Sequence, residues 1–192
     1  MVQQFRPAIV LLLLFTLLTG LVYPLLLTGL GQVLMPHQAN GSLINEGGRV
    51  IGSELIGQNF AAPFHFHGRP SAAGTGYDAA NSSGSNFGPA SKALIDRTRD
   101  SVKAARADGL AGNVPADMVT ASASGLDPEI SPETAMAQVA RVAKARGLAP
   151  TTVAGLVRRN VDGPMLGVIG EPRVNVLAIN RQLDRIAAQP PR

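Results

Sequence analysis

A long run of apolar side chains near the N-terminus dominates the hydrophobic pattern of the chain. The segment 8–34 carries no charged residue, and its only strongly polar side chain is Gln32. A helix of this length spans about 40 Å, whereas the hydrocarbon core of a bilayer is about 30 Å thick. Lipid offers no partner to open backbone groups, so a single segment crosses it only as a helix. The pattern therefore predicts a transmembrane helix over 8–34.

Two other interpretations of this segment compete with a membrane anchor. A cleaved signal peptide has an apolar region of about 7–15 residues followed by a small-residue cleavage site. Here the apolar region is longer, and the best cleavage candidate is a weak Gly29-Leu30-Gly31. A helix buried in a soluble core is unusual at this length. A lipoprotein is excluded because the chain has no cysteine to lipidate.

The charges that flank the span predict its orientation. Arg6 and the N-terminal amine lie just before it, and the next Lys or Arg is Arg49. The positive-inside rule places such a cationic end in the cytoplasm. We therefore expect a cytoplasmic tail over 1–7 and a single pass, with everything after Leu34 outside the cytoplasm.

One face of the predicted span differs from the rest. Thr16, Gly20, Pro24 and Thr28 follow one another at intervals of four residues. A stripe of small and hydroxyl residues lets another helix approach closely in a membrane. The alternative is local, because Thr hydroxyls can bond to their own helix and Pro24 can simply kink it. The stripe is thus a candidate surface for packing against a partner helix.

The remaining pattern predicts a linker over 35–48 and one domain over 49–192, which is long enough to form its own core. Helical periodicity and strand-like runs alternate in this domain, which predicts the α+β class: one N-terminal transmembrane helix followed by a single extracytoplasmic α+β domain. The expected helices are 91–107 with Ser91 as N-cap, 132–146 between Ser131 and Gly147, a shorter one capped by Thr151 or Thr152, and 181–188. The expected strands lie around Gly52 and at 118–120, 166–169 and 174–179. On the helix after Ser131, the pattern places Met136, Val139, Ala140 and Ala143 on the buried face.

Composition narrows the function by exclusion. The net charge of +4 forms no basic block, so we expect no nucleic-acid partner. Zero cysteines exclude disulfides and thiolate metal sites. The phosphate-binding pattern GxxxxGK[ST] is absent, and no carboxylate lies within 8–34. This chain alone therefore has no sequence motif for nucleotide binding and no obvious ion site in the bilayer.

The segment 60–89 has no periodicity and is rich in Gly, Ser, Asn and Pro, which indicates a functional loop or disorder. His65 and His67 alternate with Phe and would share one face of a strand, but two ligands are too few for a metal site, and a surface pair is favoured. The serines at 82–85 could bind an anion through turn amides, although an ordered loop is favoured. A Ser–Asp pair near Asp127 has no local histidine base, so catalysis there is not expected.

Five motifs, in order along the chain, carry a resemblance to a known family: 68–72, 83–89, 119–128, 138–143 and 170–177. With the preceding span they resemble the C subunits of the bacterial Kdp high-affinity potassium pumps. The loop residues that match the family signature are Arg69, Pro70, Ser71, Ser83, Ser85, Asn86, Ser124, Gly125, Asp127 and Pro128. One departure is Glu129, because the family typically carries His after the Asp-Pro turn.

The resemblance implies an accessory subunit of an ATP-driven potassium importer in the bacterial inner membrane. Its implied partners are a channel-like potassium-binding subunit, a P-type ATP-hydrolysing subunit, a further small membrane subunit and membrane lipid. The family is described as needed for assembly and as a catalytic chaperone that raises the ATP affinity of the P-type subunit. ATP and potassium would belong to the complex, and no cofactor is expected on this chain.

An outer domain cannot touch cytoplasmic ATP, so any effect on nucleotide affinity must pass through helices as a coupling free energy of about 1–3 kcal/mol. The alternative from another class is a membrane-anchored extracytoplasmic hydrolase or solute-binding module. It would require a catalytic or ligand-binding constellation in the loop 60–89.

Overall fold

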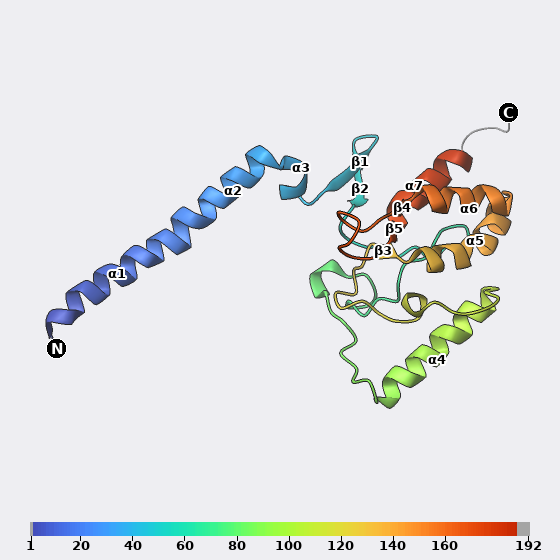
Figure 1. The fold of residues 1–192 in the computed structure, drawn as a ribbon, viewed down its shortest axis with the longest axis horizontal. Coiled ribbons are helices and arrows are strands. Elements are labelled where there is room, and N and C mark those ends of the chain that lie inside the picture. The colour runs from blue at the N-terminus through green and yellow to red at the C-terminus, as the bar shows by residue number, and fades with distance from the viewer. Residues whose placement is uncertain (1, 188–192) are drawn as a thin grey trace. The chain divides into compact units, whose positions relative to one another are not determined.

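A computed structural model describes residues 2–187, which divide into two compact units. The first unit ends at Ile51 and the second begins at Gly52. Helices and short antiparallel sheets occur together along the chain (Figure 1), which confirms the α+β class.

The first unit is dominated by one continuous helix, Phe5–Leu34, with a mean hydropathy of 2.5 over its most apolar window. It consists of α1 (Phe5–Leu17), a π-helical turn (Leu18–Val22) and α2 (Tyr23–Leu34). The helix predicted over 8–34 is confirmed, and its side chains are exposed along almost its whole length. By length and composition it is able to cross a membrane.

Pro24 accounts for the π-helical turn. Proline has no amide hydrogen and its ring collides with the carbonyl four residues earlier, here that of Gly20. A π-helical turn widens the helix and relieves this collision. Within the turn, the Thr19 hydroxyl donates to the Phe15 carbonyl over 2.7 Å, as the local interpretation of the hydroxyl residues anticipates.

The segment expected as a linker over 35–48 contains regular structure. It holds the short helix α3 (Pro36–Ala39) and strand β1 (Leu43–Glu46), which pairs with β2 (Arg49–Ser53). Gly47 and Gly48 join the two strands with φ of +56° and +79°, as a two-residue hairpin turn requires. The glycines that indicated a linker are therefore the turn of a hairpin, and β2 confirms the strand expected around Gly52.

In the second unit, three helices pack on a small antiparallel sheet. The sheet order is β3 (Glu129–Ile130), β5 (Arg173–Asn175) and β4 (Val161–Asp162). The helices are α5 (Pro132–Arg146), α6 (Pro150–Arg159) and α7 (Val176–Ala187). The core between them consists of Phe66, Ile130, Ala135, Val139, Val142, Ala143, Val153, Ala154, Leu156, Val157, Val174, Val176, Ile179 and Leu183. Irregular segments lie between this layer and most of the long helix α4 (Lys92–Ala107), whose C-terminal end lines a small cavity together with α5 (Figure 1).

Local capping signals fix the ends of α5 as expected. The Ser131 hydroxyl accepts from the Thr134 amide over 3.0 Å, Pro132 is the first helical residue, and Gly147 ends the helix with φ of +65°. The buried face was predicted less well. Val139 and Ala143 are buried, but Met136 and Ala140 are exposed.

Of two other expectations about helix starts, the structure corrects one and confirms the position of the other. Helix α6 begins at Pro150 after Ala149, so the expected caps Thr151 and Thr152 lie inside the helix and do not cap it. Proline fixes the backbone for the first helical position, which explains the earlier start. Ser91 stands at the N-cap of α4 but makes no capping hydrogen bond through its side chain.

The last expected strands are also corrected. Residues 116–118 form a 3-10 turn in place of a strand at 118–120, and 166–169 form a turn that an isolated bridge between Met165 and Ile169 closes. The strand expected over 174–179 ends at Asn175, because the side chain of Asn175 accepts from the Ala178 amide and begins α7. The helix expected over 181–188 is confirmed as part of α7, and Ala188 lies outside the described residues.

Candidate functional site

The segment 60–89 is ordered although it contains little regular structure, and its first anchor is an amide side chain. Phe66 donates its backbone amide to Asn180 Oδ1 over 2.8 Å, and Asn180 Nδ2 donates back to the Phe66 carbonyl over 2.9 Å. Both residues are buried. The side chain from α7 thus satisfies two backbone groups that would pair with a neighbouring strand in a sheet.

A second amide repeats this arrangement at the next residue. His67 donates its backbone amide to Gln138 Oε1 over 2.7 Å, and Gln138 Nε2 donates to the His67 carbonyl over 3.0 Å. Arg141 of the same helix donates to Gln138 Oε1 and to the carbonyls of Pro63 and His65. Sequence reasoning missed these anchors, for which the only signal was an amide on an otherwise apolar helix face.

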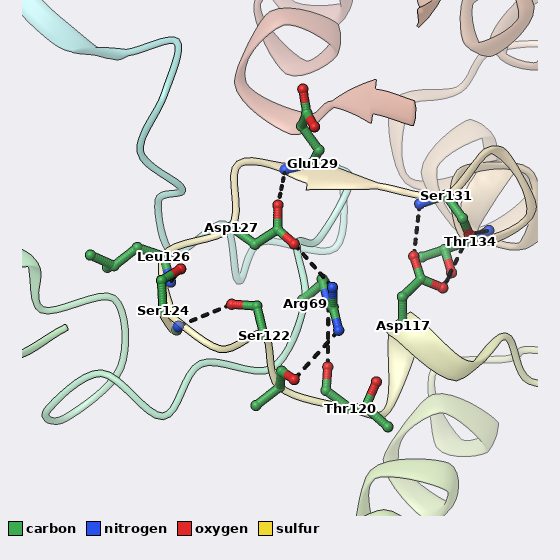
Figure 2. A network of polar contacts seen from close by, with 12 residues as sticks. Arg69, Asp117, Thr120, Ser122, Ser124, Leu126, Asp127, Glu129, Ser131 and Thr134 are labelled. Atoms are coloured by element: carbon green, nitrogen blue, oxygen red, sulfur yellow. Dashed lines mark hydrogen bonds and ion pairs between the residues drawn. The ribbon is translucent and has the colours of Figure 1, made fainter. Parts of the chain in front are cut away.

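Arg69 connects two irregular segments that are distant in sequence. Its guanidinium pairs with Asp127 Oδ2 over 3.0 Å and donates to the carbonyls of Thr120 and Ala121, both at 3.4 Å (Figure 2). Planar guanidinium donors suit such a set of acceptors, because they point in fixed directions. We call residues 68–89 and 119–128, which Arg69 joins, the loop module.

Ser71 and Tyr77 hold the first half of the loop module. The Ser71 hydroxyl donates to the Gly125 carbonyl over 2.6 Å and accepts from the amides of Ala73 and Tyr77. The Tyr77 hydroxyl donates to the Arg69 carbonyl over 2.6 Å. Burial, and then the charge of Asp127, raise the pKa of Tyr77, so its hydroxyl stays a donor at neutral pH.

Gly125 lies where the two halves of the loop module are closest. Its φ is +67°, and a Cβ there would lie 2.6 Å from the Ala73 nitrogen and the Ser83 oxygen. Next to it, Ser83 donates its amide to the Ser124 carbonyl over 3.0 Å. Only glycine fits this backbone, which explains the residue type at this position.

Six of the ten signature residues contact one another within the loop module, namely Arg69, Ser71, Ser83, Ser124, Gly125 and Asp127. The Pro128 carbonyl accepts from the Val176 amide and so joins the module to the start of α7. Pro70 lines a pocket of about 410 Å³ beside α4. Ser85 is half-buried, and the exposed Asn86 has a left-handed φ of +51°. The serines favour the ordered-loop interpretation, since their hydroxyls and amides bond within the module.

Two acidic residues beside the module have internal partners, and Figure 2 shows those of Asp117. Asp117 accepts from the Ser131 amide, the Ser131 hydroxyl and the Thr134 hydroxyl, at 2.7, 3.0 and 2.5 Å. Glu129 pairs with Arg173 over 2.8 Å. These carboxylates line an open pocket of about 510 Å³ with Arg69 and Asp127. Within residues 2–187 no group of three or more His, Cys, Asp or Glu is arranged to hold a metal ion.

The two histidines lie in different surroundings. His65 Nε2 is 3.7 Å from Asp184, whereas His67 Nε2 contacts the Ala62 carbonyl at 3.0 Å. Burial is the main cause that lowers the pKa of both side chains, and the positive charge of Arg141 adds to the lowering at His67. Asp127 is engaged with Arg69 and the Glu129 amide. Each of these three residues thus has a structural contact of its own.

Acidification should destabilise the second unit, because the folded state binds protons at these histidines more weakly than the unfolded chain does. Between the ordinary histidine pKa of 6.5 and the lowered folded value, the unfolded chain carries more protons. The contribution of the neutral histidines to the free energy of unfolding is complete above pH 6.5. It is lost as the pH falls from 6.5 through the lowered folded pKa. Urea midpoints of the full chain at about pH 7.5 and about pH 5 measure this difference. His67→Gln should reduce the difference, and an unchanged difference would contradict the assignment.

Comparison with known proteins places both the long apolar helix and the second unit in one family. The sequence model of KdpC, described as "K+-transporting ATPase, c chain", matches residues 5–185. The chain belongs to the KdpC family. It is 54% identical to the potassium-transporting ATPase KdpC subunit of Bradyrhizobium diazoefficiens over 98% of this chain and all of that protein. It is 55% identical to the subunit of that name from Caulobacter vibrioides over 100% of this chain and 96% of that protein. It is also 54% identical to the subunit of that name from Gemmatimonas aurantiaca, over 100% of this chain and 97% of that protein. The family resemblance of the five motifs is thereby confirmed.

Proposed function

We propose that this chain is an accessory, non-catalytic subunit that assembles and stabilises an ATP-driven potassium importer. The observation that carries the proposal is the family match over 5–185, which includes the apolar helix and the second unit together. The relatives are named as subunits of a potassium-transporting ATPase, so the expected partners are the other subunits of such a complex. These are a channel-like potassium-binding subunit, a P-type ATP-hydrolysing subunit and a further small membrane subunit.

The helix Phe5–Leu34 is the proposed membrane anchor. Its length and mean hydropathy suit a bilayer, and its side chains are exposed. The cation Arg6 precedes it, which favours a cytoplasmic N-terminus and an extracytoplasmic second unit in the bacterial cell membrane. In this orientation the second unit covers the entrance of the channel-like subunit and stabilises or gates it.

Packing of the span against its partners is assigned to Thr16, Gly20, Pro24 and Thr28. A strict four-residue repeat drifts by about 40° at each step of an α-helix. The π-helical turn over Leu18–Val22 contains more residues per turn and takes up part of this drift. The four small or hydroxyl positions therefore stay close to one face, which favours a close approach of another helix.

The loop module supports a structural role for the second unit. Its serines, Arg69 and Asp127 are used in internal hydrogen bonds and an ion pair, which give a preformed surface and no exposed nucleophile–base pair. A preformed surface lowers the ordering cost of assembly. An increase in the ATP affinity of the P-type subunit would then be transmitted through the membrane helices, as a coupling of about 1–3 kcal/mol.

Gly20→Leu should weaken assembly of the complex by about 1–2 kcal/mol, or about five- to thirtyfold, because leucine fills the space that a partner helix needs. Among the described residues outside its own turn, nothing lies within 4 Å of a Cβ placed on Gly20, so the chain itself tolerates the change. The measurement is recovery of partner subunits with the tagged full chain from mild detergent.

Gly29→Leu is the matched control for this experiment. Gly29 also has open space around its Cβ position, and it directly follows Thr28, so it lies about 100° around the helix from the proposed packing face. The control should leave recovery of the partners unchanged. Equal recovery with Gly20→Leu and with the unmodified chain would refute packing through this face.

A further inference from the structure

The turn between β4 and β5 presents a concentrated group of exposed apolar side chains. Met165 is 66% exposed, Leu166 83%, Val168 83% and Ile169 58%. The segment 163–170 carries no charge. Isolated exposed apolar residues are common, but four in one short turn of a folded unit form a patch that indicates an interaction site. We call residues 164–170 the apolar loop.

The apolar loop is ordered before any contact is made. Met165 donates to the Ile169 carbonyl over 2.8 Å and accepts from the Ile169 amide over 3.0 Å, while Gly167 donates to Pro164 over 3.0 Å. Leu166 has φ of +53°, a backbone conformation that a leucine rarely adopts. Held strain of this kind is typical of binding loops, because the fold maintains it against the local preference.

The apolar loop is followed in the chain by β5, whose last residue contacts the segment by which the chain enters the second unit. Asn175, at the far end of β5, donates its side-chain amide to the Glu54 carbonyl over 3.0 Å. Glu54 is among the first residues of the unit, and β5 has only three residues, about 10 Å. The neighbouring Leu55 and Ile56 are also exposed, so a second apolar pair lies at the entering segment.

We infer that the apolar loop inserts its side chains into the boundary between headgroups and acyl chains of the lipid bilayer. The inference rests on the proposed function in one respect, namely that Phe5–Leu34 spans the membrane. A span in the same chain keeps the loop at a high effective concentration near lipid, so a small apolar surface is sufficient. A stable protein interface needs about 20–30 residues on each side, which is far more than this loop offers.

The test uses the full chain reconstituted in phosphatidylcholine–phosphatidylglycerol vesicles. Because the chain has no cysteine, a single introduced cysteine carries the only spin label. The positions are Leu166→Cys in the loop, Phe15→Cys in the span and Lys103→Cys on the exposed surface of α4. The measured quantities are the collision rates of each label with oxygen, which concentrates in lipid, and with a water-soluble nickel chelate.

We expect the labels at positions 166 and 15 to collide more often with oxygen than with the nickel chelate, and the label at 103 to show the reverse. Val168→Asp, a change at a position that is 83% exposed, should return the label at 166 to water while the label at 15 stays in lipid. A label at 166 that remains in water while the label at 15 is in lipid would overturn the loop inference alone. If the label at 166 became shielded from the nickel chelate only after the other pump subunits were added, the lipid inference would also be overturned, in favour of a protein partner. If neither label were in lipid, the membrane anchor would fail as well.

Discussion

Asn180→Leu should lower the free energy of unfolding of the second unit by about 2–6 kcal/mol. The side chain of Asn180 is the partner of both the amide and the carbonyl of Phe66, and all of these groups are buried. Each buried backbone group left without a partner costs about 1–3 kcal/mol. Leucine has the same branching as asparagine and is somewhat larger, but it provides no donor or acceptor. Urea unfolding of the full chain in mild detergent, followed by far-ultraviolet circular dichroism, measures the loss.

Asn160→Leu is the matched control for this prediction. Asn160 donates to the Leu156 carbonyl and to Gln182 Oε1, at 2.9 and 3.0 Å, but it is only half-buried. Water can replace its partners, so we expect a loss below about 1.5 kcal/mol. Equal losses in the two variants would show that Asn180 does not hold the backbone of Phe66.

Gly125→Ala should cost about 2–5 kcal/mol and loosen the loop module. A left-handed φ costs an L-residue about 1–2 kcal/mol, and forcing a methyl group into a packed site adds about 1–3 kcal/mol. Here the added methyl would meet backbone atoms of Ala73 and Ser83 at 2.6 Å, and backbone cannot rotate away as a side chain can. We expect faster amide hydrogen exchange across 69–89, together with a lower urea midpoint.

Gly147→Ala is the control that separates the backbone part of this destabilisation from the steric part. Gly147 has nearly the same φ, +65°, but within the described chain nothing lies within 4 Å of its Cβ position. It should therefore cost only the backbone part, about 1–2 kcal/mol. If the two glycine variants were equally destabilised, close approach of the two halves of the loop module at Gly125 would be disproved.

The elements that local signals specify were predictable from the sequence. The long apolar helix needs only its uncharged length, and α5 needs only the cap Ser131, the first-turn Pro132 and the stop Gly147. Each of these acts within a few residues of itself, so no knowledge of the fold is required.

Elements that depend on distant partners were not predictable. The buried face of α5 includes Gln138, which a hydrophobic pattern assigns to solvent, because its partner His67 belongs to another segment. The same holds for Asn180 on α7. Asn175 ended the strand expected over 174–179, since one polar side chain that caps the next helix outweighed the β-branched residues around it.

The candidate site shows the same difference between local signals, which the sequence reveals, and distant contacts, which it does not. The family motifs singled out a set of loop residues, but their pattern did not say that Arg69 pairs with Asp127 across 58 positions of sequence. It likewise gave no partner for Glu129, which the structure pairs with Arg173. Irregular segments have no period from which a contact can be inferred, so their geometry follows only from the folded chain.

Affinity purification of the tagged full chain from mild detergent tests the central claim, that the chain is an accessory subunit of a potassium-importing ATPase. The account predicts that a channel-like potassium-binding protein and a P-type ATPase are recovered with it, and that the recovered complex has potassium-stimulated ATPase activity. Recovery of the folded chain alone, under conditions that preserve such a complex, would contradict the account.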